Sequence, residues 1–116
     1  MTTAEKAVRY RDGTAVVDLP AQVDSTAEQV LNDAYAAATA HGSKTVLLNF
    51  GGVDFLSSTG IALVVGILAR ARTDGRTISV SGLSDHYREI FEITRLVDFM
   101  TIYADENAAL KGDGAR

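Results

Sequence analysis

Three consecutive hydroxyl side chains, Ser57, Ser58 and Thr59, are the groups in this 116-residue chain best placed to take part in chemistry. They precede an apolar run that starts at Ile61, so they are predicted to lie at the start of a helix. A helix start has unpaired backbone amides and about half a positive charge, which stabilise a phosphate group. Phosphorylation there would change the local charge by about −1.5 to −2. Simple capping of the helix is the alternative interpretation.

The helix that follows carries no charged residue from Ile61 to Ala69, which is more than two turns. One face of it must pack on a sheet, but a helix on the outside of a small domain cannot bury every face. We expect an exposed apolar patch beside the hydroxyls, and such patches often mark a partner-binding surface. The candidate partner-binding residues are Ile61, Ala62, Leu63, Gly66 and Ile67. We also expect Gly60 to leave space for a kinase active site to approach.

The elements that position these residues follow from the hydrophobic pattern. Two β-favouring runs flank Asp12-Gly13, which predicts an opening β-hairpin. The remaining strands are predicted at 45–50, 77–80 and 100–103, and the helices at 26–40, 58–72, 84–94 and from 105 onward. The order is β-β-α-β-α-β-α-β-α, in which strands reached through a helix tend to pair in parallel. The sequence therefore predicts an α/β fold with a mixed, mostly parallel central sheet and an N-terminal β-hairpin.

Length and composition limit the classes of protein that this chain can be. The 116 residues suffice for one hydrophobic core, so we expect a single domain over 1–116, with a core at about 6–110 and a frayed tail at 111–116. The net charge of −4 without a basic stripe argues against direct binding to nucleic acid. The chain has no cysteine, its first residues lack the apolar run of a signal peptide, and no stretch approaches 18 consecutive apolar residues. We expect a cytoplasmic protein without membrane insertion.

Other kinds of site have little support in the sequence. Gly51-Gly52 lacks the spacing of a nucleotide-binding fingerprint, and His41 and His86 have no clustered carboxylates to complete a metal site. We therefore expect neither a cofactor nor a metal. Asp54 falls at a turn, where helix capping is the simpler interpretation. A small enzyme with Thr59 as its nucleophile remains a hypothesis, but no motif places a histidine or lysine base beside it, so we expect no catalytic residues.

Three segments, taken in order, resemble the STAS domain of bacterial anti-sigma factor antagonists over nearly the full length of the chain. The stretch 57–61, Ser-Ser-Thr-Gly-Ile, resembles the family's Asp-Ser-Ser-Gly-Leu phosphorylation motif. The stretch 19–24, Leu-Pro-Ala-Gln-Val-Asp, resembles the family segment that ends in Leu-Asp before the first helix. The stretches 82–84, 90–96 and 99–103 resemble the closing helix and strand.

The resemblance implies roles for individual residues. The family's phosphoacceptor is the hydroxyl residue before the motif glycine, which is Thr59 in this sequence, with Ser58 as the second choice. The chain departs from the motif in two ways, because Ser57 replaces the usual aspartate and threonine replaces serine as acceptor. The resemblance also places Asp24 near the acceptor. The supporting residues are Asp24, Ser57, Gly60 and Asp54.

The resemblance further implies a mechanism of partner switching. The unphosphorylated protein would bind an anti-sigma factor that is also a serine/threonine kinase, and would so free a sigma factor for transcription. Phosphorylation would break the complex, and a phosphatase would restore it. The protein would be a monomer or weak dimer. The alternative is a structural STAS module that does not switch and that belongs to a larger signalling or envelope-associated assembly.

Overall fold

A five-stranded sheet forms the centre of the molecule in the computed structural model, which describes residues 8–111. Its strands, in spatial order, are β1 (Val8–Arg11), β2 (Thr14–Asp18), β4 (Thr45–Asn49), β6 (Thr77–Ser81) and β7 (Thr101–Tyr103). β1 and β2 pair antiparallel around the turn at Asp12 and Gly13, whereas β2, β4, β6 and β7 pair in parallel. The predicted α/β fold, with a hairpin and a mostly parallel sheet, is confirmed.

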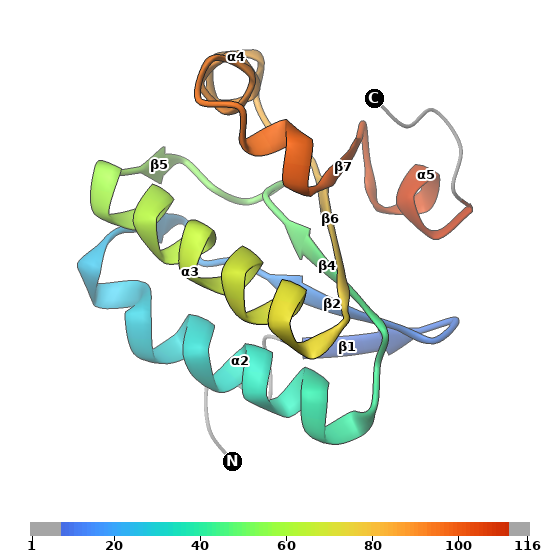
Figure 1. The fold of residues 1–116 in the computed structure, drawn as a ribbon. Helices are drawn as coiled ribbons and strands as arrows, with labels where there is room; N and C mark the ends of the chain where they lie inside the picture. Colours follow the sequence, from blue (N-terminus) through green and yellow to red (C-terminus); the bar gives the residue numbers. More distant parts are fainter. Residues whose placement is uncertain (1–7, 112–116) are drawn as a thin grey trace.

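Helices connect the parallel strands and cover the sheet. They are α2 (Glu28–His41), α3 (Ser58–Asp74), α4 (Asp85–Ile93) and α5 (Glu106–Lys111), with short 3-10 turns η1 (Ser25–Ala27) and η2 (Leu96–Phe99). Figure 1 shows α2 and α3 side by side on one side of the sheet, α4 at the top of the view and α5 on the other side of the sheet. Among the described residues, no helix has both the length and the apolar character needed to cross a membrane.

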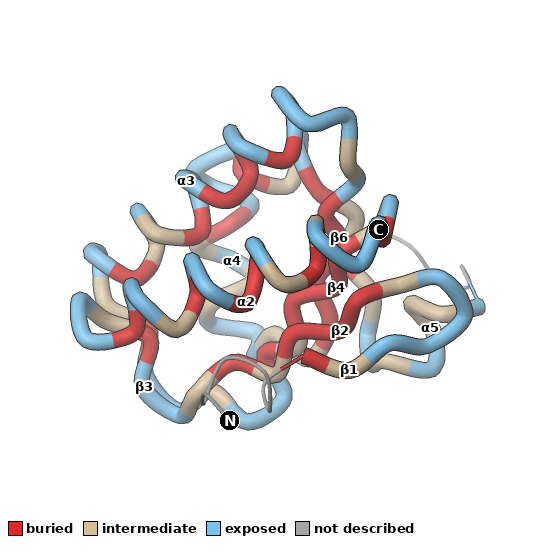
Figure 2. Tube along the Cα trace, turned by 90° about the horizontal axis from the view of Figure 1, so that it is seen from below, coloured by how far each residue is buried: buried red, intermediate tan, exposed pale blue. Residues whose placement is uncertain are grey.

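The hydrophobic core lies between the sheet and the pair α2 and α3, where the buried residues gather in Figure 2. Alternate residues of β4 divide between the two faces of the sheet, so Val46 and Leu48 join this core, while Leu47 is also fully buried. This burial on both faces explains why the strand predicted at 45–50 has no alternation of polar and apolar residues. α2 and α3 are further joined by the Tyr35 hydroxyl, which donates to Asp74 at 2.7 Å.

Charged side chains join the opening hairpin to the last described helix, on the opposite side of the sheet. The Arg9 guanidinium forms hydrogen bonds with both oxygens of Asp18, at 2.6 and 2.7 Å, and with both oxygens of Glu106 in α5. Arg11 adds a contact of 2.7 Å to Glu106. These contacts hold the pKa values of both carboxyls below their ordinary range, chiefly through the hydrogen bonds from Arg9. The predicted frayed tail lies outside the described residues, apart from Lys111 at the end of α5.

The pattern did not predict a second, two-stranded sheet. β3 (Gln22–Val23) and β5 (Phe55–Leu56) pair in parallel, with Gln22 opposite Phe55 and Val23 opposite Leu56. Each strand has two residues, which is too short for an alternating pattern to be visible in the sequence. This small sheet joins the segment before the first helix to the segment before α3, and it thereby positions the candidate site.

Candidate functional site

The first of the three hydroxyls caps α3. Ser57 has an extended backbone, and its side-chain oxygen accepts a hydrogen bond from the Gly60 amide at 3.0 Å. The Ser57 amide in turn donates to the Val23 carbonyl at 3.0 Å, which fixes the cap against β3. Because this hydroxyl is partly buried and already bonded, Ser57 supports the site structurally rather than offering a free hydroxyl.

The other two hydroxyls are exposed on the first turn. Ser58 and Thr59 are the first two residues of α3, and both are exposed to solvent. Their backbone amides lie at the end of the helix where no preceding carbonyl is available, and where the helix dipole is positive. A phosphate on either side chain would therefore lie at the electrostatically favourable end of a helix of 17 residues.

Gly60 has a structural reason to be glycine that the sequence did not reveal. The residue is buried, and a Cβ atom there would lie 2.0 Å from the Val23 carbonyl oxygen and 2.9 Å from Cδ1 of Leu56. The glycine thus faces inward and allows the start of α3 to approach β3. The expectation that Gly60 leaves space for a kinase is wrong, because the missing side chain faces the protein interior.

Asp24 lies beside the helix start, as the resemblance implied. Val23 pairs with Leu56 and accepts the Ser57 amide, so the next residue, Asp24, is adjacent to the cap of α3. Its carboxylate accepts hydrogen bonds from the Thr26 amide at 2.9 Å and from the Thr26 hydroxyl, and so caps η1. These bonds lower the pKa of Asp24 below its ordinary value, so the carboxylate stays charged at neutral pH.

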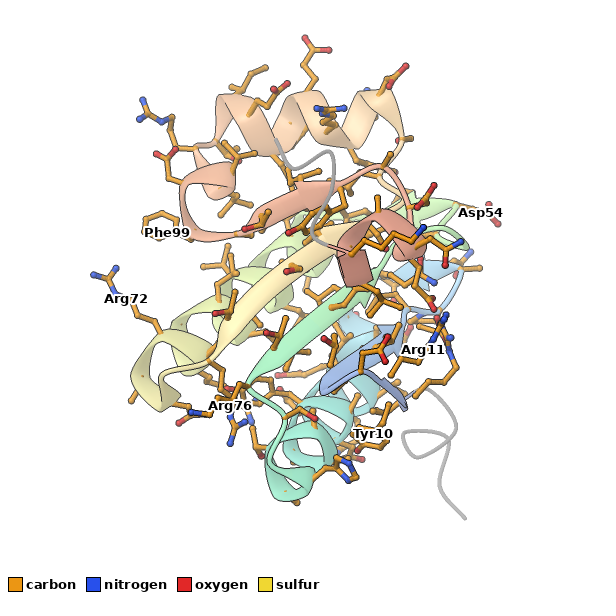
Figure 3. The ribbon with its side chains drawn as sticks, turned by 90° about the vertical axis from the view of Figure 1, so that its right-hand side faces the viewer. Tyr10, Arg11, Asp54, Arg72, Arg76 and Phe99 are labelled. Carbon is orange, nitrogen blue, oxygen red and sulfur yellow. The ribbon has the colours of Figure 1, made fainter. Side chains whose placement is uncertain are left out.

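Asp54 behaves differently from the prediction. Its amide donates to the Ala21 carbonyl at 2.8 Å, but among the described residues its carboxylate caps no helix, since Ser57 provides the cap of α3. Figure 3 shows the Asp54 side chain projecting away from the body of the molecule. The capping interpretation of Asp54 is therefore wrong, and its charge stands exposed on the loop before the site.

The predicted apolar surface exists in part. Ala62 and Gly66 are exposed, and Ile61 and Leu63 are partly buried. Ile67 is only 3% exposed, so its assignment to a partner-binding surface is wrong. It belongs to the inward face of α3, whose buried side chains are Val64, Ile67, Leu68 and Ala71.

Two exposed apolar residues were missed. Val65 is 42% exposed in α3, and Phe55, in β5 before the site, is 49% exposed. Val65 lies three residues after Ala62, so helical spacing could have identified it. Phe55 had no such signal, because its exposure depends on the short β3 and β5 pair.

Tyr87 of α4 is a further residue that the sequence did not single out. Its hydroxyl oxygen accepts a hydrogen bond from the Leu56 amide at 3.0 Å, across 31 residues of sequence. The short strand β5 before α3 is therefore held from two sides, by β3 and by α4. No spacing rule connects Tyr87 with Leu56, so only the structure reveals this contact.

The described residues contain no arrangement suited to a metal. Within 8–111 no group of three or more His, Asp or Glu side chains lies close enough together to hold an ion. His41 stacks on the ring of Tyr10 with a centroid separation of 3.8 Å, and His86 lies next to Tyr87 with the rings tilted. Both histidines are exposed.

A mixed sheet, a capped helix start with two exposed hydroxyls and a small accessory sheet define a small α/β domain that presents one helix end to solvent. The family model described as "Mlab, STAS domain" matches residues 7–102. The chain belongs to the STAS domain family.

Individual relatives agree with this family. BtrV of Bordetella bronchiseptica is 28% identical over 98 residues, which are 84% of each chain. The anti-sigma-B factor antagonist of Staphylococcus aureus is 33% identical over 61 residues, 53% of this chain and 56% of that protein. The phosphorylated form of the Bacillus cell fate determinant SpoIIAA is similar in fold, with a TM-score of 0.69 and 21% identity, over 90% of this chain and 96% of that one.

Proposed function

We propose that this protein is an anti-sigma factor antagonist that binds an anti-sigma factor and is released from it by phosphorylation at Thr59. The observation that carries the proposal is the pair of exposed hydroxyls on the first turn of α3, beside a cap that is already complete without them. Ser57 explains the capping of the helix, so capping does not account for Ser58 and Thr59.

The residue order supports Thr59 as the acceptor. In the family motif the acceptor precedes the glycine, and here that glycine, Gly60, is fixed by its close contact with Val23. Thr59 directly precedes this glycine, which supports Thr59 as the acceptor and leaves Ser58 as the neighbouring position. Because both side chains are exposed, Ser58 is the alternative acceptor.

The proposed reaction needs no catalytic group from this chain. The Thr59 hydroxyl oxygen forms a bond to the γ-phosphorus of ATP held by the partner kinase, the bond to ADP breaks, and the hydroxyl proton is released. The STAS chain presents the acceptor hydroxyl, and the kinase supplies the ATP and the general base that takes the proton. A phosphatase would reverse the change by hydrolysis. On this proposal the protein is not an enzyme and needs no cofactor of its own.

The effect on binding follows from charge. A phosphate adds about −1.5 to −2 charges at the start of α3, in a region that already carries the charged Asp24 after β3 and the exposed Asp54 before β5. It also stands beside the exposed apolar side chains of Phe55 and Ala62, which a partner would otherwise cover. Desolvating a phosphate in such an interface is costly, so the complex separates. Because sigma factors act in transcription, we place this switch in the cytoplasm.

The direct test is phosphorylation by the partner. The protein, T59A and S58A should be incubated with the cognate anti-sigma factor, ATP and Mg²⁺, and the modified residue mapped by mass spectrometry. We expect modification at Thr59, its loss in T59A and its persistence in S58A. Calorimetry should then show at least about tenfold weaker binding of the anti-sigma factor after modification. Tight binding without modification would support the alternative, a structural module that does not switch.

A further inference from the structure

A groove of about 740 Å³ opens along the second half of α3, away from the helix start. It lies between α3, the beginning of β6 and the segment from η2 to β7. Its larger apolar lining residues are Val65, Leu68, Ile78, Leu96, Phe99 and Met100. Phe99 is 57% exposed, which leaves a large apolar surface open to solvent. Exposed apolar surface gathered around a groove is typical of a protein interface.

The rim of this groove is basic. Arg72 and Arg76 line it. The Arg76 guanidinium donates to the carbonyls of Ser43 and Thr39, whereas Figure 3 shows Arg72 and Phe99 projecting from the same edge of the molecule. Asp98 also lines the groove, but its carboxylate is paired with Arg95 at 2.9 Å. The whole chain has a net charge of −4, so a basic apolar groove is unusual for its surface and selects an acidic apolar occupant.

The same molecule carries a surface of that chemistry. The last turn of α4 presents Glu89, Glu92 and Ile93, which lie on one helix face at i, i+3 and i+4. All three are exposed, and Ile93 is 73% exposed, the highest value among the exposed large hydrophobic residues of the described chain. This turn therefore combines one uncovered apolar side chain with two negative charges.

We propose that the groove binds the Ile93 turn of a second copy of this chain. Ile93 would fill the apolar groove between α3 and η2, and Glu89 and Glu92 would face Arg72. α4 leads directly into η2, so the donating turn and the receiving groove adjoin on each copy. A two-fold axis can then bring both turns into both grooves, which closes the assembly as a dimer. The dimer surface uses the far half of α3, so this inference does not depend on phosphorylation at Thr59.

The first test measures how the average molecular mass of the protein in solution depends on its concentration. Sedimentation equilibrium from about 10 μM to about 1 mM should show reversible dimers for the unmodified protein. I93E should raise the dimer dissociation constant at least about tenfold, because it places a charge in an apolar contact. R72E should raise it about tenfold by reversing the charge complementarity. K44E is the matched control, since it makes the same change of charge at an exposed lysine outside the groove.

A mixing experiment identifies the occupant. R72E alone and the double variant E89R/E92R alone should each dimerise at least about tenfold more weakly than the native protein, because each opposes like charges in both contacts of the dimer. An equal mixture of the two should form heterodimers, since one contact is then native and the other has its charges exchanged. A mixture that stays monomeric, or a native protein that is monomeric at every concentration, would overturn the proposal and assign the groove to a different acidic partner.

Discussion

The close contact at Gly60 allows a quantitative prediction for G60A. A Cβ atom at this position would lie 2.0 Å from the Val23 carbonyl oxygen, whereas such contacts essentially never fall below 3.0 Å. The start of α3 and β3 must therefore separate by about 1 Å. That shift strains the bond from the Ser57 amide to Val23, which is 3.0 Å long in the native protein.

The energetic terms oppose each other. Overpacking costs about 1–3 kcal/mol, and weakening the cap and its backbone bond costs about 1 kcal/mol more. Alanine favours a helix over glycine by about 0.8–1 kcal/mol, which offsets part of this loss. We expect G60A to lower the free energy of unfolding by about 1–3 kcal/mol, and the melting temperature by roughly 5–15 °C.

G66A provides the matched control. Gly66 lies in the same helix and is exposed, and a Cβ atom there meets nothing within 4 Å. The same substitution should therefore raise the free energy of unfolding by about 0.5–1 kcal/mol. Urea unfolding followed by circular dichroism compares the two variants with the native protein. If G60A were as stable as G66A, the argument that β3 excludes a side chain from the helix start would be refuted.

Three further predictions concern the contacts around the site and the sheet. S57D should keep the cap and add a favourable charge at the helix start, so urea unfolding should show a gain of about 0.3–1 kcal/mol; a loss would mean that the hydroxyl does more than cap. Y87F removes the acceptor for the Leu56 amide and should cost about 1–3 kcal/mol in the same assay, while hydrogen exchange at that amide becomes faster. Arg9 lowers the pKa of Asp18 below its ordinary value of 3.8. The contribution of this ion pair to the free energy of unfolding is therefore complete above pH 3.8, and it is lost as the pH falls through the lower folded-state pKa. D18N should remove that part of the acid dependence of unfolding, and an unchanged pH profile would contradict the assignment.

The elements that were predicted correctly share a strong local signal. The hairpin at Asp12 and Gly13, the capped helix after Ser84 and the buried strand at 45–49 each depend on residues close together in the sequence. The spacing of hydrophobic residues and the residue types found at turns are sufficient to predict such elements from the sequence. The same local reasoning placed the hydroxyls at a helix start, where the structure has them.

The contacts that were missed all depend on distant residues. The pairing of Val23 with Leu56 and the bond from Leu56 to Tyr87 join segments more than 30 residues apart. Ile67 was misassigned for a related reason, because a helix that is apolar all round does not show which side faces the sheet. Tertiary packing determined that orientation.

The start of α3 contains two kinds of residue: those that stabilise the fold, and those whose side chains are exposed and available for modification. Ser57 provides the cap and Gly60 provides the close contact with β3, so the geometry of the helix start is complete without Ser58 or Thr59. A phosphate on Thr59 therefore has no native hydrogen bond to break among the described residues, and the helix dipole favours it. Serine at position 57 keeps the capping bond that the family's aspartate would make but leaves out its negative charge. On the proposed function, serine at this position preserves the local fold and changes the charge beside the acceptor, so we expect S57D to alter recognition by the partner kinase in addition to its small gain in stability.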